Sequence, residues 1–442
     1  MNNVTPSDSL YRSRNMNRCF SLLLLSLVFT HTCKADNWPQ WRGADWTSKS
    51  AEASLPSELD TEKNLLWRTP MPGPAGSSPV VWEEQAFVTS IDGDKLLLIC
   101  VDVKSGEVKW QQELVGKNKA SRDHSNSASP SPCTDGEHVW AMMGNGNLAC
   151  YTVAGEKVWH KDLQEAYGKF DIQFGMATTP ILDNGKLYLA LIHGNMKNSE
   201  TSEGQVIALD AKSGKEIWLH QRKTNATREN KHSYASPVIY RDKEHEMLIT
   251  HGGDFVIAHS LQDGSELWRC GGFNPKGESY NPFFRLVSSP SCADGIIVAP
   301  TAKRGPVLGL KVDSQGDVTE EPTARHWELK KGTPDVATPV VYDGLIYLAG
   351  EKGALSCLDV KSGEVKYRKR LLADKHRSTP VAVDGRLIIA DRKGTVFVIK
   401  AGPEFEVLSK CELEEETTAS PAISNGKVFI RTYEALYAFG EK

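Results

Sequence analysis

The 442-residue sequence has no hydrophobic run long enough to cross a bilayer as a helix. Its most apolar stretch, residues 19–29, is about half of the roughly 20 residues that a span requires. Arg12, Arg14 and Arg18 precede this stretch, and small and polar residues follow it. The pattern predicts a signal peptide over residues 1–35, cleaved near Ala35, and therefore a periplasmic or secreted protein with no membrane span.

Lipidation at Cys33 is the alternative fate of this N-terminus, because a lipoprotein signal also ends in cysteine. The three preceding residues, Thr30, His31 and Thr32, lack the usual leucine and the small residue next to the cysteine. We therefore expect simple cleavage rather than a lipid anchor.

A basic surplus is also absent, since the net charge is -4 and the pI is about 6.3. Proteins that bind nucleic acid need clustered positive charge to neutralise phosphates, so no nucleic-acid partner is expected. The chain contains no G-x-S-x-G, no H-E-x-x-H and no P-loop. No catalytic residue is assigned from the sequence.

Cysteine is scarce, and no C-x-x-C pair offers a metal or redox site. Seven cysteines follow the predicted signal peptide: Cys100, Cys133, Cys150, Cys270, Cys292, Cys357 and Cys411. Three of them fall in one slot of an internal repeat that other copies fill with alanine, and Cys133 and Cys292 are assigned to a second common slot. Side chains that alternate with alanine are small and buried, so we expect no disulfide.

The internal repeat is the strongest signal in the chain. Eight triplets lead into apolar strands, each with Ser, Thr or Ala first, Ser or Thr second and proline third. The prolines are Pro79, Pro130, Pro180, Pro237, Pro290, Pro339, Pro380 and Pro421. Most copies end in Asp-x-x-x-Gly-x-x-x-Trp. Strand-like repeats of about 40 to 50 residues are typical of β-propellers.

Each copy can be divided into four strands. In the first copy they are expected at residues 77–82, 85–91, 96–102 and 107–114, separated by tight turns that contain Asp or Gly. The sequence thus predicts an all-β fold with four-stranded antiparallel blades.

The blade ending resembles the pyrroloquinoline-quinone (PQQ)-type repeat with its tryptophan-docking motif. Ala208, Asp210, Gly214 and Trp218 match that motif fully, and other copies match in part. The resemblance covers nearly all of the chain after the signal and implies an eight-bladed propeller of the exported bacterial type. In such a fold the tryptophan packs between adjoining blades.

Ring closure follows from counting strands. The eighth copy, residues 420–440, supplies three strands and lacks the tryptophan strand, whereas residues 64–68 form an unmatched one around Trp67. We expect this N-terminal strand to complete the last blade; seven blades with a loose end are the alternative. Residues 63–442 would form the propeller and residues 36–62 an extension on one face, with Trp38 and Trp41 covering apolar surface.

One function that the resemblance suggests is that of a PQQ-dependent quinoprotein dehydrogenase. Members with that activity hold PQQ near the axis on calcium, below a ring formed by two adjacent disulfide-bonded cysteines. This chain has no adjacent cysteine pair and is shorter than those enzymes. PQQ with calcium is therefore kept only as an alternative, and no cofactor is expected.

The other reading is a non-catalytic scaffold. The repeat architecture resembles the propeller component of the outer-membrane barrel-assembly machinery, which binds partner protein rather than quinone. This resemblance implies a monomeric ring that recognises an envelope or extracellular protein, or a small ligand. A carbohydrate or other small-ligand binder that uses the same face is a further alternative.

Candidate ligand-binding residues lie in the segments that precede each inner strand, because these segments surround the central opening. They are His124, Asn126, Arg228, His232, Arg285, Asp335, His376 and Arg377. His, Arg and Asn groups near one axis suit an anionic or hydroxylated ligand. Polar loops of this kind also tie blades together without binding anything. The histidines come from separated blades, so no metal site is expected.

Overall fold

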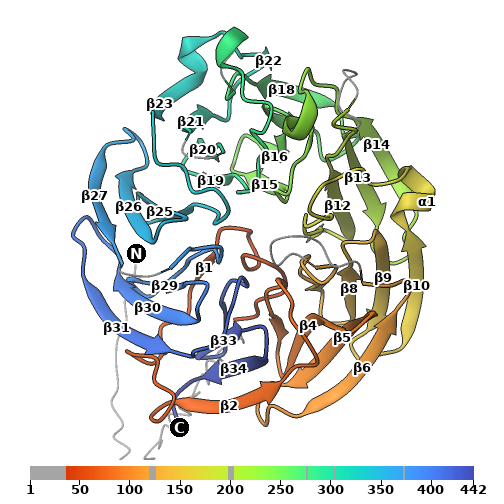
Figure 1. Ribbon diagram of the computed structural model, residues 1–442, viewed down its shortest axis with the longest axis vertical. Helices are drawn as coiled ribbons and strands as arrows, with labels where there is room; N and C mark the ends of the chain where they lie inside the picture. Colours follow the sequence, from red (N-terminus) through yellow and green to blue (C-terminus); the bar gives the residue numbers. More distant parts are fainter. Residues whose placement is uncertain (1–35, 119–125, 198–203, 275–276, 303–304, 372–373) are drawn as a thin grey trace, which may run out of the picture. The chain divides into compact units, whose positions relative to one another are not determined.

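The computed structural model describes residues 36–118, 126–197, 204–274, 277–302, 305–371 and 374–442. The predicted signal peptide, Cys33 and the candidate His124 lie outside these residues. Within them, eight sheets are arranged around one axis, as the ribbon in Figure 1 shows. The prediction of an all-β, eight-bladed propeller is confirmed.

Every blade has four antiparallel strands. Blade 1 contains β3 (Val80–Trp82), β4 (Gln85–Asp92), β5 (Lys95–Asp102) and β6 (Val108–Leu114), and blade 2 contains β7 (Cys133–Thr134), β8 (His138–Met142), β9 (Asn147–Thr152) and β10 (Lys157–Asp162). Blade 3 contains β11 (Ile181–Asp183), β12 (Lys186–Leu191), β13 (Gln205–Asp210) and β14 (Glu216–Gln221), and blade 4 contains β15 (Val238–Arg241), β16 (Glu246–Gly252), β17 (Phe255–His259) and β18 (Glu266–Cys270).

Blade 5 contains β19 (Ser291–Ala293), β20 (Ile296–Pro300), β21 (Val307–Lys311) and β23 (Arg325–Leu329), and blade 6 contains β24 (Val340–Tyr342), β25 (Leu345–Ala349), β26 (Ala354–Asp359) and β27 (Val365–Arg370). Blade 7 contains β28 (Val381–Val383), β29 (Arg386–Ala390), β30 (Thr395–Lys400) and β31 (Val407–Glu412), and blade 8 contains β32 (Ala422–Ser424), β33 (Lys427–Arg431), β34 (Ala435–Phe439) and β2 (Leu65–Pro70). Short additions are β1 (Lys49–Ser50), β22 (Gly316–Asp317), the helix α1 (Leu163–Tyr167), and single turns at Arg228–Lys231, Gly277–Ser279 and Pro322–Ala324.

The two ends of the described chain meet in blade 8. Strand β2 pairs antiparallel with β34, with Arg68 opposite Tyr437 and Thr69 opposite Leu436. The N-terminal strand therefore completes the last blade as predicted, and it removes the open edge that β34 would otherwise present.

A closed ring of hydrogen bonds joins the inner ends of all eight blades. In each blade one Ser or Thr hydroxyl accepts from the backbone N–H of the equivalent residue in the neighbouring blade, at 2.8–3.3 Å. The ring residues are Ser78, Ser131, Thr179, Ser236, Ser289, Thr338, Thr379 and Ser420, and all are buried. This arrangement explains why the repeat requires Ser or Thr before proline.

The ring corrects the alignment of the second copy. Its ring residue is Ser131, followed by Pro132, whereas the sequence prediction used Pro130. The assumed common slot for Cys133 and Cys292 is therefore wrong, because Cys133 directly follows its proline and Cys292 stands one position later. The SPSP stretch offers two registers, and only the contacts between blades distinguish them.

Tryptophans join the outer parts of adjoining blades. Six indoles, from Trp67, Trp110, Trp159, Trp218, Trp268 and Trp327, donate to a turn carbonyl in the next blade at 2.8–3.2 Å. Packing between blades is confirmed for these residues. Trp327 was not recognised from the sequence, because the segment around β22 lengthens the fifth copy and breaks the motif spacing.

The extension before β2 crosses the axis at the ends of the inner strands. Trp38 exchanges two backbone hydrogen bonds with Val81 in blade 1, and the Gln40 side-chain amide pairs with the backbone of Leu182 in blade 3. Strand β1 then runs parallel to β28 in blade 7. These contacts place the segment across one opening of the ring, opposite the loops that precede the inner strands.

All seven cysteines of the described chain are free, as expected, and all except the half-buried Cys292 are buried. Burial raises the pKa of Cys100, Cys150 and Cys357 to about 12, so these thiols are unreactive at neutral pH.

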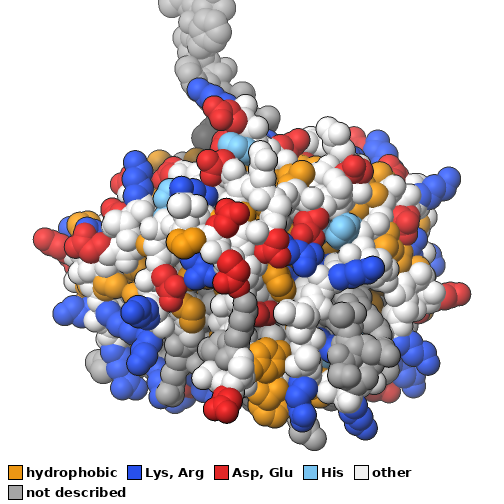
Figure 2. Space-filling model, turned by 90° about the horizontal axis from the view of Figure 1, so that it is seen from above, with side chains coloured by type: hydrophobic (Ala, Val, Ile, Leu, Met, Phe, Trp, Pro, Cys, Tyr) orange, Lys and Arg blue, Asp and Glu red, His pale blue; other side chains and the backbone are white. Residues whose placement is uncertain are grey.

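The surface of the ring carries mixed charge. Lys and Arg side chains alternate with Asp and Glu on the side of the molecule seen in Figure 2. Within the described part of the chain, no helix has the length and apolar character needed to cross a membrane.

Candidate functional site: the axial cavity

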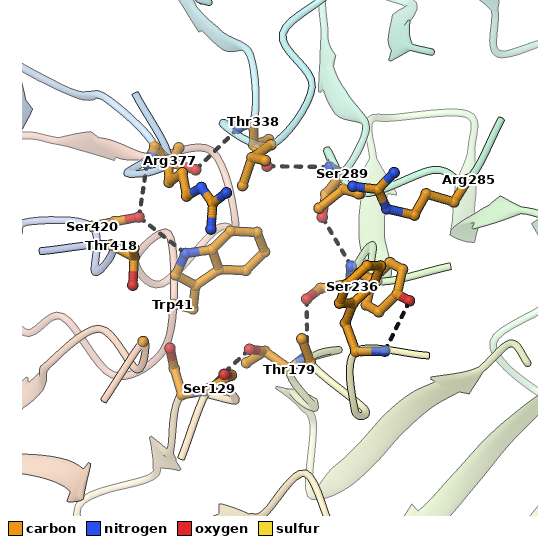
Figure 3. A pocket seen from close by; sticks show the side chains of 18 residues that line it. Trp41, Ser129, Thr179, Ser236, Arg285, Ser289, Thr338, Arg377, Thr418 and Ser420 are labelled. Atoms are coloured by element: carbon orange, nitrogen blue, oxygen red, sulfur yellow. Dashed lines mark hydrogen bonds between the residues drawn. The ribbon is translucent and has the colours of Figure 1, made fainter. Parts of the chain in front are cut away.

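A cavity of about 220 Å³ lies on the axis, on the side of the loops that precede the inner strands (Figure 3). Each blade supplies to its wall the residue two positions before its ring hydroxyl. These residues are Gly76, Ser129, Ala177, Tyr234, Val287, Val336, Arg377 and Thr418. Seven of the eight ring hydroxyl residues also contribute to the lining. The same repeat that builds the blades therefore builds the cavity.

Trp41 forms the floor of the cavity. Its indole N–H donates to the ring hydroxyl of Ser420 at 3.4 Å, and Figure 3 shows the indole inside the circle of ring residues. The next residue, Arg42, is buried and donates to the carbonyl of Pro290 and to the hydroxyl of Ser291. Trp41 is thus held by the extension and lines the cavity, whereas Trp38 is buried in the core as a covering residue.

Arg285 is one of two charged residues in the lining. Its guanidinium lies 5.3 Å from the centre of the Phe174 ring and 3.6 Å from the Glu229 carboxylate. Phe174 in turn packs against Tyr234, with ring centres 6.0 Å apart. Two aromatic rings and a guanidinium therefore form one wall of the cavity.

Arg377 is the second charged lining residue, and it comes from blade 7. Its Nε atom lies 3.7 Å from Glu351, which is half-buried. Figure 3 shows the side chains of Arg285 and Arg377 reaching inward from different blades. In the described part of the chain, no Asp, Glu or Cys residue lines this cavity.

The other candidate residues do not line this cavity. Asn126 donates to the carbonyl of Pro74 and borders a separate cavity near α1. Arg228 is exposed at the start of a helical turn, and Asp335 is half-buried. Among the members of the predicted set that the structure describes, only Arg285 and Arg377 are therefore brought together at this cavity.

His232 and His376 lie beneath the loops, with no exposed surface. His232 Nε2 is 3.0 Å from the carbonyl of Gly194, and burial lowers the pKa of both rings. His232 ties neighbouring loops together, and His376 Nδ1 lies 3.5 Å from the carbonyl of Ala390 in β29. No group of three or more His, Cys, Asp or Glu that could hold a metal is found in the part of the chain that the structure describes.

Glu415, in the acidic run at residues 414–416, has defined hydrogen-bond partners. Its carboxylate accepts hydrogen bonds from Arg68 and Tyr437, and its side chain is only 11% exposed. Arg68 lies on β2, so Glu415 helps to hold the closing strand.

Sequence reasoning missed Trp41 and Phe174 as cavity residues. The spacing of the wall could have been found from the repeat, because each wall residue stands three positions before the blade's proline. Trp41 and Phe174 obey no such spacing, and only the crossing extension and a loop bring them to the axis.

A family model described as outer membrane protein assembly factor BamB, of the PQQ-like repeat class, matches residues 57–196, 135–366 and 312–402. These matches together extend over well over half of the sequence. The chain belongs to this family.

Curated relatives carry the same name. A protein from Burkholderia pseudomallei is 29% identical over 157 residues, which are 34% of this chain and 39% of the relative. One from Moranella endobia is 25% identical over 51% of this chain and 45% of its own length. This chain thus spans less than half of the length of these two relatives.

Two solved structures share the fold. The crystal structure of BamB from Moraxella catarrhalis superimposes with a TM-score of 0.60 at 13% identity, over 85% of this chain and 99% of that chain. Quinohemoprotein alcohol dehydrogenase from Comamonas testosteroni gives a TM-score of 0.67 at 12% identity, over 92% and 81%. At these identities the likeness concerns architecture alone.

Proposed function

We propose that this protein is an exported, non-catalytic scaffold of the cell envelope that binds a partner protein on the face of the inter-blade loops. The axial cavity is the observation that carries the proposal. It offers two guanidinium groups, aromatic rings and hydroxyls, which are binding groups, and its described lining holds no paired acid, base or nucleophile. The family and the names of its curated relatives support a role in the assembly of envelope proteins.

Phe283 extends the same face beyond the cavity. It lies in the loop before β19, two residues from Arg285, and its side chain is 51% exposed. Large exposed aromatic residues next to arginine are characteristic of protein contact sites. We therefore place the partner over this loop and the cavity mouth.

Photo-crosslinking in cells that export the protein tests this placement. A benzoylphenylalanine at position 283 should give a discrete adduct with an envelope protein. The matched control is the same group at Val407, which is 41% exposed on the outer strand β31. An adduct from position 407 without one from position 283 would contradict the proposal.

PQQ with calcium, the alternative, does not fit the described residues around the axis. A calcium ion requires several oxygen ligands, usually with carboxylates, and none of the lining residues is Asp or Glu. The chain also has no adjacent cysteine pair. On this proposal the chain shares the propeller fold with quinoproteins but not their cofactor chemistry.

Incubation with PQQ and calcium provides the corresponding test. We expect no dye-linked alcohol oxidation above the background of the free cofactor. Turnover that scales with protein concentration would overturn the non-catalytic assignment.

A further inference from the structure

The guanidinium of Arg285 faces the axial cavity with its hydrogen-bonding capacity unused. A guanidinium has five N–H donors. Among the described residues, the Arg285 side chain makes an ion pair of 3.6 Å with Glu229 and a ring contact with Phe174, but no hydrogen bond. Its side chain is only 18% exposed, so a ligand that reaches it would be largely shielded from water.

The surroundings of Arg285 select the shape of a ligand. Phe174 and Tyr234 stand on one side of the cavity, and the Trp41 indole forms its floor. Burial raises the pKa of Tyr234, so its hydroxyl stays neutral and can donate. A flat apolar group would contact these aromatic side chains. The hydroxyl groups and backbone of the Ser and Thr residues that join the blades form the remaining wall.

The size of the cavity limits the ligand. Pockets for drug-sized ligands usually enclose about 300–1,000 Å³, whereas this one encloses about 220 Å³. The space suits one small ring and one polar group. A larger ligand would have to leave most of its body outside.

We propose that the axial cavity binds a carboxylate attached to a small aromatic group, with the carboxylate on Arg285 and the ring between Trp41 and Phe174. A planar carboxylate matches the two parallel donors of a guanidinium. Arg377 adds a second guanidinium to the wall, and the carboxylates that pair with the two arginines, Glu229 and Glu351, are not among the residues that line the cavity. The inference rests on the proposed binding function of this face and specifies the chemistry of what enters it.

Binding of 3-phenylpropionate, measured by calorimetry or ligand-observed NMR, tests the proposal against its neutral amide. We expect a Kd of about 1 mM or tighter for the acid, as for a ligand of this size. The amide should bind at least about tenfold more weakly, because it cannot form the charged hydrogen bonds. Equal affinities for the two compounds, or no binding of the acid, would overturn the proposal.

Three variants locate the site. Arg285→Met should weaken binding of the acid at least about tenfold and leave the amide unchanged, and Arg285→Lys should restore part of the loss. Arg241→Met is the matched control, since Arg241, at the end of inner strand β15, pairs with Asp183 and Glu246 and does not line the cavity. Unchanged binding in Arg285→Met would exclude this residue as the carboxylate site.

The same carboxylate chemistry occurs in free aromatic acids and at the C-terminus of a polypeptide. Acetyl-Gly-Gly-Phe with a free carboxylate, compared with its C-terminal amide, distinguishes the sources. Tighter binding of the free-acid peptide than of 3-phenylpropionate identifies a chain terminus as the ligand, and binding of 3-phenylpropionate alone identifies a small acid. Photo-crosslinking at position 283 is independent of the cavity, so it separates failure of this inference from failure of the scaffold function.

Discussion

The glycine and the tryptophan of the repeat form one contact between different blades. Gly264 of blade 4 has a φ of +74°, and a Cβ placed there would lie 2.5 Å from the Trp218 ring of blade 3. The glycine therefore serves both the left-handed turn and the close approach of the indole. The carbonyl of Leu261 accepts the Trp218 N–H at 3.2 Å, which fixes the ring in that place.

Trp218→Ala should lower the free energy of unfolding by about 3–5 kcal/mol, because a large buried ring is removed between rigid sheets. Denaturant unfolding measures the change. Ile217→Ala is the matched control: the neighbouring side chain is 44% exposed, and its loss should cost under about 1 kcal/mol. Equal effects of the two substitutions would show that the indole does not stabilise the junction of the blades.

The N-terminal extension acts as a cross-brace at the scale of elements. It contacts the inner strands of blades 1 and 3, joins β28 of blade 7 through β1, and reaches blade 5 through Arg42. Arg42 is 2% exposed and has three hydrogen bonds, to Ser48, Pro290 and Ser291. Burial lowers its pKa to about 10.

Arg42→Met should release this brace while leaving the blades intact. The backbone amides of Val81 and Ala382 donate to Trp38 and Ser48 of the extension. We expect their hydrogen exchange to become at least about tenfold faster, since each hydrogen bond to a charged group contributes about 1.5–3 kcal/mol. Arg325→Met, on the outer strand β23 where Arg325 pairs with Glu328, should leave both amides unchanged. Unaltered exchange in Arg42→Met would contradict the bracing role.

At the scale of the whole molecule, buried histidines in blades 3 and 4 make the stability of the fold depend on pH. Burial lowers the pKa of His193 and His251 to about 4 and that of His259 to about 3. The nearby His232 further lowers the pKa of His193, and the positive charge of Arg222 further lowers the pKa of His251 and His259. Their side chains have almost no exposed surface. The folded ring must therefore keep them neutral in mildly acidic solution.

Stability should fall as the pH falls from about 6.5 to about 4. The unfolded chain binds protons at these rings near pH 6.5, whereas the fold does not. Each proton bound only by the unfolded chain changes the free energy of unfolding by about 1.4 kcal/mol per pH unit. The three histidines should therefore lower the free energy of unfolding by about 3 kcal/mol between pH 6 and pH 5. Denaturant unfolding at pH 7, 6 and 5 measures this loss, and ring titration near pH 6.5 in the folded protein would contradict it.

The sequence alone determined the number and composition of the blades. Apolar strands, Ser/Thr-Pro starts and Asp-Gly turns are local signals, and they recur with a regular period, so eight units and the role of residues 64–68 could be read directly. The packing of Trp218 between blades was also predicted, because Ala208, Asp210, Gly214 and Trp218 match the tryptophan-docking motif of the PQQ-type repeat. These features depend on neighbours in sequence or on the repeat itself.

Only the tertiary structure decided what lies at the axis. The choice of Ser131 over Ser129, the burial of His232 and His376, and the place of Trp41 all depend on contacts with other segments of the fold, and the hydrogen bond between Trp41 and Ser420 joins residues 379 positions apart. Of the candidate binding residues, Arg285 and Arg377 line the cavity and the other described ones do not. A ring closes its centre by packing eight inner strands and one crossing segment together. The repeat spacing marks the eight wall positions, but no local pattern in the chain brings Trp41 and Phe174 to the axis.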